Sequence, residues 1–356
     1  WYMITNAQPW DNLRFDTEGI AEIQRKFFGT LHNTYAFLAL YAGIDGFDPA
    51  SDPPAVDTRP ELDRWILSKL HTCIEEVQAS FDAFEPTRAG RTIQSFVVDD
   101  LSNWYVRLGR RRFWKSDSDA DKSAAYATLH TCLRNVSILM SPIAPFHADR
   151  LWQDLGGSDS VHLADWPVVD GQLQDAELEA RMGLAQKLSS LTLSLRKREK
   201  IKVRQPLKRI LVPVLDAGFG ERLAAVSDLV KGEVNVKSIE PLAEDSGILT
   251  KKLKADFKKL GPRFGKQMKQ VAAGIAALGQ DDIRTLEQNG AISLNLADGP
   301  VEVMLDDVEV LTEDIPGWLV AGEGGLTVAL DIEITPALRS EGLARELVNR
   351  IQQRRK

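Results

Sequence analysis

The period of the apolar residues changes along this chain of 356 residues, and this change does most to limit its fold. Between residues 62 and 155, apolar side chains recur at spacings of three and four, the period of one face of an α-helix. Beyond residue 210, the apolar runs are short and are bounded by Gly, Pro and Asp, as in β-strands. We therefore predict a multidomain chain, with an all-α helix bundle followed by an α+β module.

The helical period places several helices in the first part of the chain. Asp16 is expected to cap the first of them, and Pro86 and Pro145 suit the first turn of two others. Residues 1–16 are expected to be irregular, and a polar loop is expected at 116–121. The predicted helices cover residues 16–38, 62–84, 86–108, 129–140, 145–155 and 184–195.

Strands and helices alternate in the second part. A strand at 210–214, a helix at 221–231 and a strand at 234–239 predict a βαβ unit. A helix is predicted at 264–278, and Pro336 is expected to open the last helix. Further strands are predicted at 291–296, 301–305, 308–311, 318–321 and 326–331.

Two stretches rich in turn-forming residues divide the chain, one at 43–60 with four Pro and one at 156–167. The chain starts at Trp1 instead of Met and ends within a helical pattern, so we expect it to be a piece of a longer protein. The predicted divisions are a connector with the first helix at 1–50, a helical bundle at 51–170, a linking helix at 171–200 and a truncated α+β module at 201–356.

Catalytic and metal-binding patterns are missing from the sequence. There is no P-loop, no Gly-rich dinucleotide turn and no Gly-x-Ser-x-Gly elbow, and the histidines lack metal-ligand spacing. Asp99 and Asp100 are adjacent on a predicted helix, so their carboxylates diverge. Cys73 and Cys132 lie on apolar helical stripes and are expected to be buried free thiols in a reducing, cytoplasmic compartment. No apolar run has the length of a membrane span.

The formal net charge of −7 hides a segregated distribution. The stretch between Arg284 and Arg339 has no Lys or Arg, and the positive charge gathers upstream in three clusters. Such a chain can present a basic face to a polyanion while it stays acidic overall. The stretch contains, among other acidic residues, Asp298, Glu302, Asp306, Asp307, Glu309, Glu313, Asp314, Glu323, Asp331 and Glu333.

The first cluster mixes arginine with aromatic residues over 103–115. At 100° per residue, Asn103, Arg107, Arg110 and Trp114 share one lateral stripe, whereas Trp104 points along the apolar face. Exposed aromatic rings and guanidinium planes can stack on the bases of an RNA loop. The alternative is a solvated basic helix end whose arginines offset the helix dipole.

The other two clusters predict contacts to phosphates that carry no sequence information. A solvated basic face is the alternative for both. The second cluster comprises Arg196, Lys197, Arg198, Lys200, Lys202, Arg204, Lys208 and Arg209, opposed only by Glu199. The third comprises Lys251, Lys252, Lys254, Lys258, Lys259, Arg263, Lys266 and Lys269, opposed only by Asp256.

Several segments resemble the isoleucyl-tRNA synthetases, a family of class I aminoacyl-tRNA synthetases. Residues 103–114 resemble the helix of their anticodon-binding domain, and 139–146 with Leu151 and Trp152 resemble a motif shared with the valyl and leucyl enzymes. The similarity extends over the whole chain and is greatest to the branch that includes the eukaryotic enzymes and those of some bacteria. The other similar segments are 1–3, 11–15, 24–31, 33–35, 202–207 and 314–318.

The resemblance implies a fragment that binds the tRNA anticodon stem and loop in a ligase that attaches isoleucine to its tRNA with ATP. The catalytic and editing domains would lie outside it, so no catalytic residue, cofactor or metal is expected here. ATP, magnesium and possibly zinc would belong to the full-length enzyme. The expected tRNA-binding residues are Asn103, Trp104, Arg107, Arg110, Arg111, Arg112, Trp114, Lys115, Arg196, Arg198, Lys200, Lys202 and Arg204.

The expected partner is the isoleucine-specific tRNA. We expect the protein to be a monomer that binds neither DNA nor a membrane. Two alternatives remain open at this point. One is a fragment of a valyl- or leucyl-tRNA synthetase. The other is a non-catalytic scaffold for protein partners, on which the basic clusters are only solvated.

Overall fold

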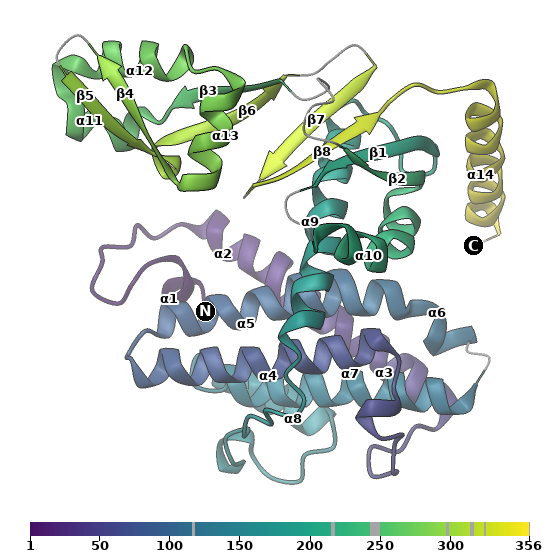
Figure 1. The fold of residues 1–356 in the computed structure, drawn as a ribbon. Helices are drawn as coiled ribbons and strands as arrows, with labels where there is room; N and C mark the ends of the chain where they lie inside the picture. Colours follow the sequence, from purple (N-terminus) through teal and green to yellow (C-terminus); the bar gives the residue numbers. More distant parts are fainter. Residues whose placement is uncertain are drawn as a thin grey trace. The chain divides into compact units, whose positions relative to one another are not determined.

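The chain is described by a computed structural model for residues 1–115, 118–214, 218–242, 250–296, 299–313, 317–323 and 325–355 (Figure 1). It divides into two compact units, Trp1–Ala180 and Arg181–Lys356, each of which we describe by itself. The division into four segments inferred from the sequence stays a prediction.

The first unit is helical, as predicted. Two π-helical segments, η1 (Gln24–Phe28) and η3 (Phe96–Val106), join α-helices end to end, and short 3-10 turns occur at Val56–Thr58 and Val161–Leu163. Helix α9 (Ala176–Arg198) begins in this unit and continues into the second. The other helices are α1 (Tyr2–Asn6), α2 (Thr17–Ile23), α3 (Gly29–Asp45), α4 (Glu61–Asp82), α5 (Pro86–Ser95), α6 (Arg107–Lys115), α7 (Asp119–Met140) and α8 (Pro145–Asp154).

The predicted helix starts are mostly confirmed. Asp16 caps α2 by accepting hydrogen bonds from the amides of Glu18 and Gly19, and Pro86 and Pro145 stand in the first turns of α5 and α8. The loop predicted at 116–121 is shorter, because Ser118 caps α7 and the helix begins at Asp119. Residues 116 and 117 lie outside the described part.

The prediction of an irregular start is confirmed for residues 7–16 but was wrong for residues 2–6, which form α1. This short helix has no apolar period of its own and is fixed by contacts distant in sequence. Arg91 on α5 donates from Nε to the carbonyl of Thr5 at 2.7 Å and from Nη2 to that of Asn6 at 3.2 Å. These bonds satisfy carbonyl groups at the end of α1, which a helix terminus otherwise leaves without partners.

The core of the first unit is built from the predicted apolar stripes. Trp65 and Leu70 of α4, Leu101 of η3 and Leu133 of α7 are fully buried. Phe84 was wrongly placed on the stripe of α4. The helix ends at Asp82, and Phe84 adopts a left-handed backbone with φ of 59° and an 85% exposed side chain.

The two cysteines are confirmed as buried free thiols. Cys73 lies on α4 and Cys132 on α7, and burial raises the pKa of each thiol well above its ordinary value. Each therefore stays protonated at neutral pH and packs as a small apolar side chain.

The second unit contains a four-stranded sheet in the order β2-β1-β8-β7. Strands β1 (Leu207–Pro213) and β2 (Val236–Leu242) are parallel and flank α10 (Phe219–Val234), so the predicted βαβ unit is confirmed. Strands β7 (Trp318–Glu323) and β8 (Leu326–Asp331) form an antiparallel pair, and β8 also pairs with β1. Helix α14 (Pro336–Arg354) begins at the predicted proline.

A separate cluster of elements lies between β2 and β7 in the sequence. Strands β3 (Thr250–Ala255) and β6 (Val308–Glu313) are antiparallel, as are β4 (Ala291–Leu296) and β5 (Gly299–Met304). They share one apolar core with α11 (Phe257–Phe264), α12 (Met268–Ala276) and α13 (Gln280–Asn289).

Three features of this cluster were not predicted. Strand β3 was missed because its sequence, TKKLKA, has one large apolar residue, Leu253, which packs into the core. Helix α13 was missed because its sequence, QDDIRTLEQN, has two large apolar residues, Ile283 and Leu286, which pack into that core. The predicted helix at 264–278 starts earlier, after the Asp256 cap, and is interrupted at Gly265, whose φ is 44°.

Within the described residues, no helix combines the length and the apolar character that a membrane span needs.

Burial of His130 makes the stability of the first unit sensitive to pH. The ring contacts the Leu155 carbonyl at 2.9 Å, and burial lowers the pKa of His130 below 6.5, with Arg134 acting in the same direction. The unfolded chain then takes up a proton at a higher pH than the folded one, so stability is complete above the unfolded pKa and falls as the pH drops through it. Burial lowers the pKa of His71 and His147 likewise.

We expect the free energy of unfolding, measured with urea, to fall between about pH 7.5 and about pH 5.5. His130→Asn should lose part of this dependence, because the uncharged amide has no proton to take up in that range. An unchanged slope in the variant would assign the pH dependence to other groups.

Candidate nucleic-acid interface

One continuous helical run, α5–η3–α6, presents the predicted RNA-binding residues. Helix α6 follows directly on the π-helical segment η3. Asn103, Arg107, Arg110 and Trp114 are exposed, as the stripe predicted. Arg111 and Lys115 are exposed beside them, so one side of the helix end is cationic.

Aromatic rings lie among these arginines. Trp114 has 46% of its surface exposed and lies 5.8 Å from the ring of Tyr41 on α3. The guanidinium carbon of Arg110 is 5.9 Å from the Trp114 ring and 5.8 Å from the ring of Phe37. Cations at this distance from aromatic faces are attracted by the ring quadrupole, so Arg110 is oriented while it stays accessible. Arg107 lies 5.7 Å from the Trp104 ring and also donates to the Asn103 carbonyl.

The sequence did not point to Phe37 and Tyr41 as part of this surface. They lie one turn apart on α3 and are in contact with each other at 5.0 Å. Buried Phe113 packs against Phe37 at 4.9 Å and joins the aromatic residues of α3 to α6. The sequence does contain a signal, which is the spacing of four residues between these two aromatic side chains. The same spacing is common among core residues of a helix, so it did not identify a surface site.

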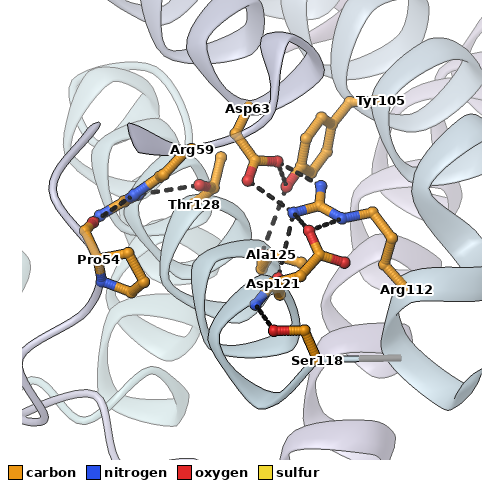
Figure 2. A network of polar contacts seen from close by, with 9 residues as sticks. All are labelled: Pro54, Arg59, Asp63, Tyr105, Arg112, Ser118, Asp121, Ala125 and Thr128. Atoms are coloured by element: carbon orange, nitrogen blue, oxygen red, sulfur yellow. Dashed lines mark hydrogen bonds and ion pairs between the residues drawn. The ribbon is translucent and has the colours of Figure 1, made fainter. Parts of the chain in front are cut away.

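Two of the predicted contacts point inwards instead of facing solvent: Trp104 is buried, and the side chain of Arg112 is 16% exposed. Trp104 is 5% exposed and packs in the core, in agreement with its place on the apolar stripe. Arg112 is turned inwards, where it makes ion pairs with Asp63 and Asp121 (Figure 2). A guanidinium held in this way is not available to an external phosphate, so the placing of Arg112 at the RNA surface is corrected.

Arg196 of the second cluster is also buried, with 1% exposure. Its guanidinium donates to the carbonyls of Lys202, Gln205 and Asn235 at 3.3, 3.0 and 2.9 Å. Burial lowers its pKa to about 10, so it remains charged at neutral pH. Arg196 therefore holds the loop that follows α9, and its placing as an RNA contact is corrected too.

The other members of the second cluster lie at the end of α9, on this loop and at the start of β1, where Arg209 pairs with Glu240 at 2.9 Å and with Asp331 at 3.4 Å. Lys202 and Arg204 share one carboxylate, Glu346 of α14, at 3.3 and 3.4 Å. Arg198 and Lys200 are exposed at the start of the loop. An RNA phosphate at Lys202 or Arg204 would therefore compete with an exposed ion pair, which is worth little energy in water.

The third cluster is less positive in three dimensions than in the sequence. Arg263 pairs with Asp307 at 2.6 Å, Lys254 pairs with Glu309 at 3.3 Å, and Lys259 donates to the Asp306 carbonyl at 2.8 Å. These partners belong to the acidic stretch that is distant in sequence. The side chains of Lys251 and Lys266 lie outside the described part.

Residues that could hold a metal ion are not gathered anywhere in the described part of the chain, where no group of three or more His, Cys, Asp or Glu side chains meets. Asp149 of α8 accepts hydrogen bonds from Ser160 Oγ at 2.7 Å and from the Val161 amide at 2.9 Å. It fixes the segment after α8 and has a structural role.

Arginines and a tryptophan exposed on one helix end are suited to contact with an RNA loop. A family model described as the anticodon-binding domain of tRNA ligase matches residues 63–211. The matched residues run from α4 through α9 into β1, so the chain contains an anticodon-binding domain and continues into a module that contains strands.

Across its whole length the chain is similar to isoleucine–tRNA ligases. It is 55% identical to that of Porphyromonas gingivalis strain W83, with 100% of this chain and 31% of the relative covered. The enzyme of Bacteroides thetaiotaomicron is also 55% identical and is covered to 31%, and that of Streptomyces coelicolor is 40% identical and covered to 34%. The chain thus spans about a third of the length of these curated relatives. They are bacterial, and they do not support the placing in a branch with the eukaryotic enzymes.

The two tryptophans of the helical run should respond differently to truncation. We expect Trp104→Ala to lower the free energy of unfolding by about 3–5 kcal/mol, because a buried ring leaves a cavity. Trp114→Ala should change it by less than about 1 kcal/mol, because the ring is half exposed. Urea denaturation followed by circular dichroism measures both, and equal losses would contradict the division into core and surface.

Proposed function

We propose that this chain is the tRNA-binding part of an isoleucine–tRNA ligase, and that the exposed face of α6 binds the anticodon loop. The observation that supports this most is the group formed by Arg110, Trp114 and Tyr41, which offers a cation and two aromatic rings at one accessible place. Bases of an unstacked loop bind to such surfaces by stacking, while nearby arginines bind phosphates.

The proposed contacts are revised by the geometry. Arg107, Arg110, Arg111, Trp114 and Lys115 remain proposed contacts, together with exposed Asn103. Trp104, Arg112 and Arg196 act through the residues that they hold in place. Arg198, Lys200, Lys202 and Arg204 are proposed as phosphate contacts of lower specificity, because they lie on a loop and two of them are paired.

Specificity for the isoleucine tRNA is part of the proposal and is supported by the names of the similar proteins. In the full-length protein, energy from binding the anticodon end would help to place the acceptor end for the reaction. ATP and magnesium, possible zinc, a cytoplasmic location and a monomer that does not bind DNA are proposed for that protein as a whole.

Binding of isoleucine tRNA to the chain is the direct test, measured by fluorescence anisotropy over a series of salt concentrations. We expect a steep loss of affinity with salt, because each neutralised phosphate contributes a slope of about −0.7 to −0.9 in log affinity against log salt. The triple change of Arg107, Arg110 and Arg111 to Glu should abolish binding and leave the circular dichroism spectrum unchanged.

A matched control carries the same change of charge on other helices of the same unit. Arg25, Arg88 and Arg150 are exposed, and their triple change to Glu alters the net charge equally. Its effect on affinity should be much smaller. If both triple variants lose affinity for the tRNA equally, the attraction depends on net charge and not on the face of α6. Binding that does not depend on salt would favour the scaffold for protein partners. Competition with valine tRNA and leucine tRNA tests the specificity.

A further inference from the structure

A buried polar network lies directly behind the exposed face of α6. Arg112 donates from Nη1 and Nη2 to the two carboxylate oxygens of Asp63 on α4, at 2.6 and 2.8 Å. Its Nε donates to Oδ1 of Asp121 on α7 at 2.9 Å. The hydroxyl of Tyr105 donates to Oδ1 of Asp63 at 2.8 Å (Figure 2). Three separate helical segments therefore meet at one guanidinium.

The network is strong because its central carboxylate is buried and hydrogen-bonded. Asp63 is 0% exposed, and both its oxygens are occupied. Burial by itself lowers the pKa of Arg112, but the hydrogen bonds to Asp63 and Asp121 raise it above its ordinary value. Burial and the charge of Asp63 raise the pKa of Tyr105, so the hydroxyl keeps its proton and acts as the donor. Removal of Arg112 would leave the buried carboxylate of Asp63 without its opposite charge.

The geometry of the network fixes the rotation of α6 about its axis. A guanidinium is a planar fork whose bidentate bonds to a carboxylate have one orientation. Arg112 is the inward-facing neighbour of Arg111 and lies two residues from both Arg110 and Trp114. A rotation or shift that broke the bonds of Arg112 would therefore also move the cationic and aromatic face.

The preceding segment makes such an anchor necessary. Residues 96–106 form the π-helical segment η3, in which the turns are wider than in an α-helix and the hydrogen bonds are of a rarer type. The period of an α-helix therefore does not carry the direction of α5 through to α6. The direction of Arg107, Arg110 and Trp114 therefore depends on the phase of η3 and on tertiary contacts beyond it, among them the bonds of Arg112 and the packing of buried Phe113.

We propose that the Arg112–Asp63–Asp121 network is a positioning device for RNA recognition, which sets the direction of the exposed face of α6 without touching the RNA. This inference rests on the proposed function, because it assigns a role for that same surface. Arg112 is then a positioning residue, and its task depends on the two-pronged shape of its side chain as well as on its charge.

Arg112→Lys tests this directly, because lysine keeps the charge but cannot make the bidentate pair. Arg59→Lys is the matched control. Arg59 is also buried, at 9% exposure, and it donates to Pro54 O at 2.8 Å and to Thr128 Oγ1 at 2.9 Å, neither of which lies on α6 (Figure 2). Both variants are expected to melt at a lower temperature, since both lose buried hydrogen bonds.

Two measurements on the 356-residue chain, made well below the melting temperatures, separate positioning from stability. The first is affinity for an RNA hairpin with the anticodon loop of isoleucine tRNA. It should fall about 10-fold in Arg112→Lys and less than about 2-fold in Arg59→Lys. The second is amide hydrogen exchange, which should become faster over residues 107–115 in Arg112→Lys alone.

Equal effects of the two variants on affinity, or exchange over 107–115 that Arg112→Lys does not accelerate, would overturn the proposal. If Arg112→Lys does not fold, Asp121→Asn takes its place, because that side chain is 29% exposed and asparagine preserves its shape. It should give the same pattern to a smaller extent. Failure of the unsubstituted chain to bind the hairpin would reject the proposed function, and the exchange measurement would still decide on the anchor.

Discussion

The cost of burying the carboxylate of Asp63 is the constraint on which the arrangement of the first unit depends. A charge in a protein interior is tolerated only when opposite charge and hydrogen bonds surround it. Asp63 meets this condition through Arg112 and Tyr105, which come from the same helical run some 40 residues later in the sequence. The first turn of α4 can therefore be buried only if α6 lies against it in one orientation.

This constraint separates the arginines of α6 by function. Arg112 points inwards and makes four hydrogen bonds, whereas Arg110 and Arg111 are exposed on the same helix. On our proposal, the inward-facing guanidinium of Arg112 holds α6 in one orientation. The exposed guanidinium groups of Arg110 and Arg111 place positive charge on its outer surface. A preorganised surface loses less conformational entropy when it binds RNA, so the internal pair contributes to affinity without any contact.

Much of this was predictable from the sequence, because helix position and exposure follow from local patterns. The stripe of Asn103, Arg107, Arg110 and Trp114 was identified from the helical period, and Pro86 and Pro145 marked two helix starts. The inward turn of Arg112 was not predictable in this way, because its partners Asp63 and Asp121 lie on other helices. For the same reason the third basic cluster looked more positive than it is, since Asp307 and Glu309 reach it only in the folded chain.

The position of the π-helical segment explains why the helical period predicted the exposed residues of α6 correctly. A stretch of wider turns changes the phase between the helix before it and the helix after it. The predicted stripe begins at Asn103, near the end of η3, and continues on α6, so it does not depend on the phase of α5. A prediction that extended one α-helical period from α5 through η3 to α6 would have been out of phase with α6. On our proposal, the direction of the exposed face of α6 thus depends on tertiary contacts of Arg112. In the sequence, Arg112 cannot be told apart from the arginines beside it.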